Sequence, residues 1–364
     1  MSSNFGHIVK ISIFGQSHGE AIGVVMDGLP AGEKIDLERI AAFMARRAPG
    51  GAGATQRREK DHVRVLSGLV DGFTCGAPLC AVIENTDAKS ADYKAIQDVP
   101  RPMHADYPAH VKHGGYNDVR GGGHFSARLT APLCFAGAVC MQLLEKAGVT
   151  IAGHILSAGG VTDTPFDPMS EDALLLARLS QMKLPVIDES AAERMLSAAE
   201  EAKNAGDILG GSIELCVLGL PVGLGEPPFD GVENRLSQAL YAVPALKAID
   251  FGAGRAAAQM RGSEHNDPYC VKDGKIRTLT NRHGGILGGL TTGMPLLLTC
   301  YFKPTPSIAQ EQQSVSLSAM KEAVLSVRGR HDPCVALRAV PCVEAAAAVA
   351  LYDLYLEARA HGHE

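Results

Sequence analysis

Residues 7–26 read HIVKISIFGQSHGEAIGVVM, two apolar runs joined by a short polar turn that contains two glycines. In the first run Val9, Ile11 and Ile13 fall at every second position, which is the spacing of side chains on one face of a strand. The second run, 21–26, is apolar almost throughout. We therefore predict a strand over the first run, and the signals further along the chain decide how it is covered.

A helix is expected directly after this region. Asp36 precedes Ile40 and Met44, which are spaced as on one face of a helix, and an Asp in that place can accept hydrogen bonds from the first free backbone amides. The helix should stop near 46–50, where Pro49 and Gly50 follow.

A second helix is expected over 190–205. Ser190 and Glu193 have the spacing of a capping box, and Gly206 suits the residue just after a helix C-terminus.

The remaining clear signals are a strand and a late helix. Apolar residues alternate within 211–219, and the Ala-rich segment 343–358 has high helix propensity. Strand and helix signals are intermixed without the regular rhythm of a parallel sheet. We therefore predict an α+β fold in which antiparallel sheets are covered by helices.

The composition excludes several classes of protein. The 364 residues are 46% hydrophobic and 20% charged, with a formal net charge of −6. This is typical of a globular protein and argues against nucleic-acid binding through a basic face. No secretory signal is visible after Met1, and apolar runs such as 131–141 are too short to span a bilayer. The nine cysteines include no C-x-x-C pair, so we expect reduced thiols in a cytoplasmic protein with no nucleic-acid or membrane partner.

The most informative region is the polar, aperiodic segment 85–130. A segment of this length without periodicity in a compact domain is either functional or disordered. Tyr93, Tyr107 and Phe125 supply aromatic anchors, which argues against disorder. We expect an ordered active-site loop that carries His104, His110, His113 and His124 together with Arg101, Arg120 and Arg128.

Two motifs could bind anions, and each has a structural alternative. Arg46 and Arg47 match the geometry of phosphate or carboxylate, but cations at a helix C-terminus also complement the helix dipole. The glycines 121–123 let backbone amides approach a ligand, with Ser126 and Arg128 close behind. A tight turn before a buried helix would use the same glycines.

Two late motifs and two histidines complete the candidates. Segment 303–307, KPTPS, is either a rigid binding loop or the exit of an edge strand. Asp332 is either a general acid/base or the cap of a turn before Pro333. His18 and His104 lie in loops punctuated by Gly or Pro, which favours function over structure. The residues alone therefore predict an enzyme with an anion-binding cleft that uses His and Arg.

The order of these motifs along the chain resembles that of the chorismate synthase family. The matching segments are 14–19, 46–50, 55–59, 84–87, 101–107, 118–128, 223–227, 281–289, 303–307 and 329–341. Because they run nearly end to end, the resemblance covers residues 1–364 as one domain. It implies a β-α-β sandwich fold and a homotetramer.

The resemblance also implies a reaction and its residues. The family converts 5-enolpyruvylshikimate 3-phosphate to chorismate by 1,4-anti elimination of phosphate, with reduced FMN and no net redox change. NADPH is the reductant in members that reduce their own flavin. Of the two catalytic histidines, which map to His18 and His104, one is expected to protonate the flavin and the other to assist the departing phosphate. The acid that assists proton removal maps to Asp332.

The expected binding residues fall into three groups. Those for FMN are His124, Phe125, Ser126, Pro244, Ala245, Gly288, Lys303, Pro304, Thr305, Pro306, Ser307 and Arg330. Arg47 matches a position assigned to NADPH, and the substrate anions are expected at Arg46, Arg128 and Arg338.

Several positions depart from the family's usual pattern. Gln16 stands where many members have Glu, Ala48 interrupts a run of Arg, and His124-Phe125 replaces Arg-Ser. No Arg occurs in 51–54, where a further one is common. Because these changes thin the positive charge, we expect weaker affinity for phosphate-bearing ligands than in Arg-richer relatives.

Three alternative functions are compatible with the same residues. A flavin reductase would consume NADPH without eliminating phosphate. A metal-dependent phosphate-ester hydrolase would use His18, His104 and Asp106 and would lose activity to a chelator. A binding or scaffold protein would be indifferent to loss of either histidine.

Overall fold

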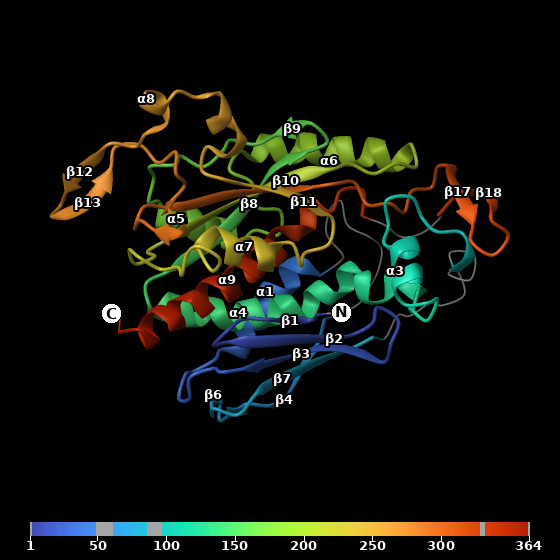
Figure 1. Cartoon of the computed structure of the whole chain (residues 1–364), viewed down its shortest axis with the longest axis horizontal. Helices are drawn as coiled ribbons and strands as arrows, with labels where there is room; N and C mark the ends of the chain where they lie inside the picture. Colours follow the sequence, from blue (N-terminus) through green and yellow to red (C-terminus); the bar gives the residue numbers. More distant parts are fainter. Residues whose placement is uncertain (1, 49–60, 86–96, 328–331, 363–364) are drawn as a thin grey trace.

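Two five-stranded sheets enclose a layer of helices in the computed structural model, which describes residues 2–48, 61–85, 97–327 and 332–362 (Figure 1). Every pairing within the two sheets is antiparallel. The predicted α+β class and the β-α-β sandwich are therefore confirmed. One core of buried side chains extends through all three layers, from Val9 to Ala358.

The first sheet has the order β1-β2-β3-β7-β4. Its strands are β1 (Asn4–Phe5), β2 (Lys10–Gly15), β3 (Ala21–Asp27), β7 (Leu79–Glu84) and β4 (Val63–Ser67). The strand predicted over 7–14 is confirmed, but it starts at Lys10. The physical reason is that the backbone amides of His7, Ile8 and Val9 donate to the carboxylate of Asp353, each at 2.8 Å, instead of to a neighbouring strand.

The second sheet has the order β11-β16-β10-β8-β9. Its strands are β11 (Leu246–Phe251), β16 (Leu296–Phe302), β10 (Gly211–Leu218), β8 (Thr150–Ala158) and β9 (Val161–Thr162). The strand predicted over 211–219 is β10. Ile213 faces the main core, whereas Cys216 and Leu218 pack with Leu176 in a smaller core on the other face of the sheet.

The helices between the sheets are α1 (Leu37–Arg47), α4 (Thr130–Lys146) and α9 (Ala336–Ala360). The predicted start and end of α1 are confirmed, since the Asp36 side chain accepts from the amides of Glu38 and Arg39. The late helix is longer than the predicted 343–358. Helices α4 and α9 pack closely because a Cβ on Gly137 would lie only 2.3 Å from Ala345.

The apolar runs are longer than the sequence indicated. Stretches Ala127–Lys146 and Ala336–Ala360 are long and apolar enough to cross a membrane by length and composition, and 89% of the most apolar window of each is buried inside the protein. The apolar run 131–141 is shorter than the helix because Gln142 interrupts it, although Leu143 and Leu144 continue the buried helix. Buried core helices have the same length and composition.

Further helices cover the outer face of the second sheet and one end of α9. Helices α5 (Ala173–Gln181) and α6 (Glu189–Asn204) lie on the outer face, and α7 (Val232–Leu240) packs on α9 (Figure 1). The predicted capping box of α6 is wrong, because Asp188 is the N-cap and its carboxylate already accepts from the amide of Ser190. Gly206 follows the helix with φ of 71°, as predicted.

Smaller elements connect these layers. They are β5 (Leu69–Val70), β6 (Phe73–Thr74), α3 (Asp106–Lys112), η2 (Arg120–Phe125), η3 (Ala127–Leu129), η4 (Gly254–Gln259), α8 (Gly262–His265), β12 (Tyr269–Lys272), β13 (Lys275–Thr278), β14 (Ile286–Leu287), β15 (Leu290–Thr291), β17 (Gln312–Ser316) and β18 (Lys321–Leu325). The described part of 85–130 forms α3, η2 and η3, of which α3 was not foreseen. Residues 86–96 lie outside the described ranges.

A buried histidine links strands β8 and β10 to Asp163, the residue that follows β9. His154 on β8 is fully buried, with Nδ1 2.9 Å from Asp163 and Nε2 3.0 Å from Glu214 on β10. Burial alone would lower the pKa of His154, but the hydrogen bonds to both carboxylates raise it above its ordinary value.

This arrangement predicts a pH-dependent contribution to stability. A histidine whose pKa is raised in the folded state stabilises fully below its unfolded pKa of about 6.5, and the contribution is lost as pH rises through the folded value. We expect the free energy of unfolding, measured in urea from pH 6 upward, to fall with pH in the parent. In His154→Gln it should be lower at pH 6 by about 1–3 kcal/mol, with a shallower pH slope. His361→Gln, an exposed control, should keep the parent slope; equal slopes in His154→Gln and the parent would contradict the assignment.

Candidate active site

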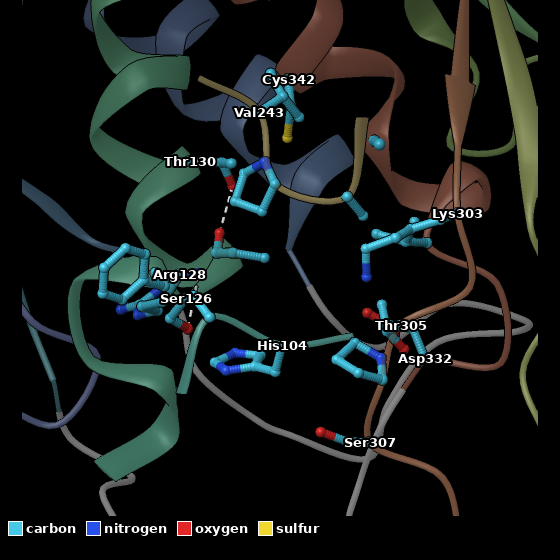
Figure 2. A pocket seen from close by; sticks show the side chains of 18 of the residues that line it. His104, Ser126, Arg128, Thr130, Val243, Lys303, Thr305, Ser307, Asp332 and Cys342 are labelled. Atoms are coloured by element: carbon cyan, nitrogen blue, oxygen red, sulfur yellow. Dashed lines mark hydrogen bonds between the residues drawn. The ribbon is translucent and has the colours of Figure 1, made fainter. Parts of the chain in front are cut away.

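A cavity of about 580 Å³ opens at one end of the helical layer. Its walls come from parts of the chain that are distant in sequence: 101–105, 121–130, 241–245, 303–307 and the start of α9. In Figure 2 the side chains of His104, Lys303 and Asp332 converge on this space. The volume is that of a site for a small molecule or cofactor.

The glycine run forms one wall. Gly121, Gly122 and Gly123 all have positive φ, of 58°, 82° and 54°, which only glycine adopts without strain. A Cβ on Gly123 would lie 2.0 Å from the carbonyl oxygen of Asp118, so the turn has no room for a side chain. After it, the Ser126 side chain accepts from the amide of Arg128 and starts the turn that leads into α4. The two interpretations of this motif are therefore compatible: a tight turn before a buried helix also lines the cavity.

A cluster of arginines forms the deepest charged part of the site. Arg47 donates from Nε at 3.1 Å and from Nη2 at 2.5 Å to Asp61, and Arg128 binds the other oxygen of the same carboxylate. Burial by itself would raise the pKa of Asp61, but the charges of Arg47 and Arg128 lower it. Asp61 therefore stays ionised and holds the two guanidinium groups together.

Asp332 and Arg338 extend this cluster. Arg338 Nη1 donates to the Asp332 carboxylate at 2.5 Å, and its Nη2 donates to the backbone oxygen of Arg47 at 2.9 Å. The cavity lining contains the cations Arg47, Arg101, Arg128, Lys303 and Arg338, and the acid Asp332. The site is thus locally positive in a chain of net charge −6, so it is suited to anions.

His104 is held in place by a buried ion pair. Its Nδ1 lies 2.6 Å from Asp106, and Arg101 donates to that carboxylate from Nε at 2.7 Å and from Nη2 at 2.8 Å. Burial alone would raise the pKa of Asp106, but the hydrogen bonds from Arg101 and His104 lower it. Since an ionised carboxylate only accepts, His104 carries a proton on Nδ1 and its ring is oriented by Asp106.

An apolar wall faces these charges. Val243, Pro244 and Ala245 line the cavity, and the carbonyl oxygen of Ala245 accepts from the amide of Lys303 at 3.0 Å. Ala245 and Met103, both in the lining, have positive φ of 73° and 58°. Strained backbone that persists in a cavity wall is typical of functional sites. The combination of an apolar wall and cations fits a ligand with a flat ring and a phosphate.

The structure brings most of the predicted residues to this one cavity. The lining includes His104, His124, Phe125, Ser126, Arg128, Pro244, Ala245, Lys303, Thr305, Pro306, Ser307, Asp332, Arg338 and Arg47. Pro304 lies between two lining residues without being one. His18 is buried against the wall: a Cβ on Gly121 would lie 2.5 Å from its Cδ2.

Two described residues of the prediction, Gly288 and Arg46, are not part of the cavity lining. Gly288 lies in the turn of the β14–β15 hairpin. Arg330 lies outside the described residues, so its expected role stays a prediction. Arg46 is not among the lining residues, and it donates at 2.6 and 3.1 Å to Glu344 on α9. The expected substrate role of Arg46 is thus not supported by its position, because successive residues of a helix face different directions.

Several lining residues were not foreseen from the sequence. Thr130, Tyr241 and Cys342 all belong to the cavity. Arg101, which was expected in the active-site loop without an assigned role, also lines it. Thr130 and Cys342 belong to apolar helices, and no local signal separates them from core residues.

His124 shows what one departure from the family pattern does. Its Nε2 lies 3.0 Å from the hydroxyl of Ser3, and its Nδ1 lies 3.1 Å from the carbonyl oxygen of Gly15. The ring therefore fastens the N-terminal segment to the cavity wall in a place where an arginine would add charge.

Comparison with known proteins gives a consistent result. Residues 9–356 match the family model described as chorismate synthase. Curated relatives of that name include those of Korarchaeum cryptofilum, 45% identical with 96% of both chains covered, and Lancefieldella parvula, 44% identical with 97% and 96% covered. A relative from Thermococcus gammatolerans is 43% identical, with 98% of both chains covered. A solved structure titled as a crystal structure of chorismate synthase matches with a TM-score of 0.76 and 26% identity, over 97% of this chain and 93% of that one.

The position of Arg46 yields a testable distinction between neighbours on one helix. Arg46→Met leaves Glu344 buried without its cation, which should cost about 3–5 kcal/mol in the free energy of unfolding. Affinity of the folded protein for FMN, measured by titration, should stay within about twofold because no cavity contact is lost. In the control Arg39→Met an exposed pair with Glu145 is removed, at a cost below about 1 kcal/mol. A large loss of FMN affinity in Arg46→Met, with stability unchanged, would show that the assignment is wrong.

Proposed function

The chain belongs to the chorismate synthase family, whose members are lyases, and on that premise we propose that it eliminates phosphate from 5-enolpyruvylshikimate 3-phosphate to form chorismate, with reduced FMN as cofactor. The observation that carries the proposal is that His104, oriented by Asp106, lines the same cavity as a cluster of cations. The activity is also proposed to belong to one domain that comprises residues 1–364.

The cations account for binding of the substrate. The proposed substrate carries two carboxylates and one phosphate, and guanidinium groups bind both by paired hydrogen bonds. Arg128 and Arg338 line the cavity and are each backed by a carboxylate, Asp61 or Asp332, that fixes their direction. Because the guanidinium groups are already oriented, little side-chain freedom is lost when an anion binds.

His104 is the proposed proton donor to the departing phosphate. An imidazole can supply a proton near neutral pH, which lowers the barrier to loss of a phosphate oxygen. The short contact to Asp106 keeps the ring in one orientation, with Arg101 Nη2 3.2 Å from its Nε2. His18 is proposed as the second catalytic histidine, and it would act from behind the Gly121 backbone.

Asp332 is proposed to assist removal of the ring proton. Its carboxylate lines the cavity and accepts from Arg338, which orients it beside the proposed sites for the substrate anions. This places an acid and a base in one pocket, as an elimination requires.

The residues present fit FMN. Lys303 and Ser307 offer a cation and a hydroxyl for a phosphate, and the strained Ala245 belongs to an apolar wall that suits a flavin ring. Burial and the nearby charge of Lys247 lower the pKa of Lys303. An anion bound beside Lys303 would stabilise its charged form. When bound, reduced flavin would supply the electron chemistry of the elimination, and the residues of the cavity would orient the ligands and exclude water.

Reduction of the flavin by NADPH, with Arg47 as a contact, and a cytoplasmic location complete the proposal. Arg47 lines the cavity and is firmly held by Asp61, so it is able to bind an anion there. The nine cysteines are all free, which is consistent with a reducing compartment.

We also propose that the chain is a homotetramer, as the family resemblance implies. An apolar face supports this: Val271 and Ile276 are directly opposite each other in the β12–β13 hairpin and are 78% and 71% exposed. Val222 and Tyr269 lie close by in the same surface depression and are also exposed. A patch of this kind on a globular protein usually marks an interface.

The proposed reaction is tested under anaerobic conditions. Purified protein, reduced FMN and 5-enolpyruvylshikimate 3-phosphate should yield chorismate, followed by its absorbance, and equimolar phosphate. His104→Ala should lower kcat by about 10²–10⁴-fold, because a positioned general acid contributes that much. His265→Ala, outside the cavity lining, is the matched control and should keep parent kcat.

Two outcomes would replace the proposal. NADPH consumption without release of phosphate would indicate a flavin reductase. Phosphate release that is indifferent to FMN and abolished by a chelator would indicate a metal-dependent hydrolase.

The assembly is tested by light scattering after size exclusion. The parent should have the mass of four chains, and Val271→Glu with Ile276→Glu should dissociate it because charges are then buried in the interface. Lys272→Glu on the same hairpin is the control and should not change the mass. A parent that elutes as a monomer would exclude the tetramer.

A further inference from the structure

Two cysteines face each other where the central helices reach the cavity. Cys134 on α4 and Cys342 on α9 lie with their sulfur atoms 3.8 Å apart. Both are buried, and Cys342 is part of the cavity lining, with its sulfur directed toward the cavity in Figure 2. Neither thiol has a part in the proposed elimination.

The helices are close enough at this level for the two sulfur atoms to bond. Gly137 and Ala345 lie three residues further along α4 and α9, and a Cβ on Gly137 would lie 2.3 Å from Ala345. Since side chains three residues apart share a helix face, the close backbone approach is continuous with the thiol pair. A disulfide has an S–S bond of about 2 Å, so the two sulfur atoms have to approach by about 2 Å from their present 3.8 Å.

The surroundings make the two thiols unequal. The hydrogen bond from Cys134 and the charge of Arg47 lower the pKa of Cys342, against the effect of burial. Burial raises the pKa of Cys134. In contrast, burial raises the pKa of Cys216 and of Cys300 to about 12. No cation lowers the pKa of either of these thiols. The thiol that lines the cavity is therefore the more reactive of the pair, since the thiolate is the nucleophile.

We propose that Cys342 is a peroxide-reactive thiol in the cavity wall and that Cys134 is its resolving partner, so that the pair forms a reversible disulfide between α4 and α9. This modification site is separate from the elimination chemistry. Its oxidant is hydrogen peroxide, and its reductant is a dithiol.

The chemistry balances in two steps. In the first, the Cys342 thiolate attacks one peroxide oxygen; an S–O bond forms, the O–O bond breaks, and the hydroxide released takes up the thiol proton to give water. In the second, the sulfur of Cys134 attacks the sulfenic sulfur; the S–S bond forms, the S–O bond breaks, and hydroxide leaves with the Cys134 proton as a second water. Two thiols lose two electrons in total, and one peroxide is reduced to two waters.

The cavity is the path by which peroxide reaches the pair. Cys342 is only 4% exposed, and its accessible side is the cavity wall that also carries Arg47, Arg338 and Thr130. A ligand that fills the cavity should therefore slow the reaction. This last expectation rests on the proposed function, whereas formation of the disulfide does not.

The test begins with a background that removes the thiols open to solvent. Cys75 is exposed, and Cys80 and Cys270 are partly exposed, so C75S, C80S and C270S are combined and all remaining thiols are buried. Treatment of this protein with hydrogen peroxide should remove two hydrogens from the intact mass. Peptide mapping should then find the 134–342 link, and dithiothreitol should reverse it.

Three single variants in that background assign the roles. Cys342→Ser should slow the loss of free thiols at least tenfold, and Cys134→Ser should accumulate a sulfenic acid that dimedone traps. Cys140→Ser, another buried thiol on α4, is the matched control and should form the disulfide at the parent rate. Circular dichroism establishes that each variant is folded, and Cys342→Ala replaces Cys342→Ser where the hydroxyl prevents folding.

The outcomes are decisive. Absence of the 134–342 link, or equally fast oxidation in Cys342→Ser, would overturn the inference whatever the catalytic assay shows. A link that forms at the same rate with and without saturating FMN would support the thiol pair and count against FMN in this cavity.

Discussion

The close contact between α4 and α9 is the constraint on which the rest of the structure depends. Gly137 allows the two backbones to approach, and a side chain there would force the helices apart. Both helices are buried over most of their length, so each sheet can pack on one side of the pair. The same contact decides where the site lies, because Thr130 at the start of α4 and Cys342 near the start of α9 meet at one end of the layer.

Helix α9 is held to its surroundings by carboxylates inside an otherwise apolar surface. Glu344 accepts from Arg46 on α1 and from the amide of Gly153 on β8. Asp353 accepts from the buried Arg235 on α7 as well as from three amides of the N-terminal segment. Buried charges are costly to desolvate, and they stabilise only when every partner is present. These contacts therefore specify one position of α9 against four other elements, which apolar packing alone would specify poorly.

The sequence was informative where local chemistry determines structure and uninformative where distant segments meet. The alternation of apolar residues correctly predicted β2 and β10, and Asp36 correctly indicated the start of α1. Each of these signals depends on only a few neighbouring residues. The sequence placed the start of β2 too early and did not reveal the ion pair of Arg46, because the partners Asp353 and Glu344 lie some three hundred residues away. The cavity was predicted mainly through the resemblance of ordered motifs. Without that resemblance, the residues predicted only a cleft that binds anions through His and Arg. They did not distinguish Cys342 or Thr130 from ordinary core residues.

The carboxylates behind the arginines explain how a positive cavity exists in a negatively charged chain. Without Asp61, the guanidinium groups of Arg47 and Arg128 would repel each other in a partly buried setting, and the site would be strained before any ligand bound. With Asp61 each guanidinium keeps an orientation while part of its charge still faces the cavity. The same logic applies to Asp106, which accepts from both Arg101 and His104 and so lets a cation and an imidazole stand side by side. Each acid reduces the attraction for an anion somewhat, but it gives the cation a fixed direction, and for a ligand with three separate anionic groups direction matters more than total charge.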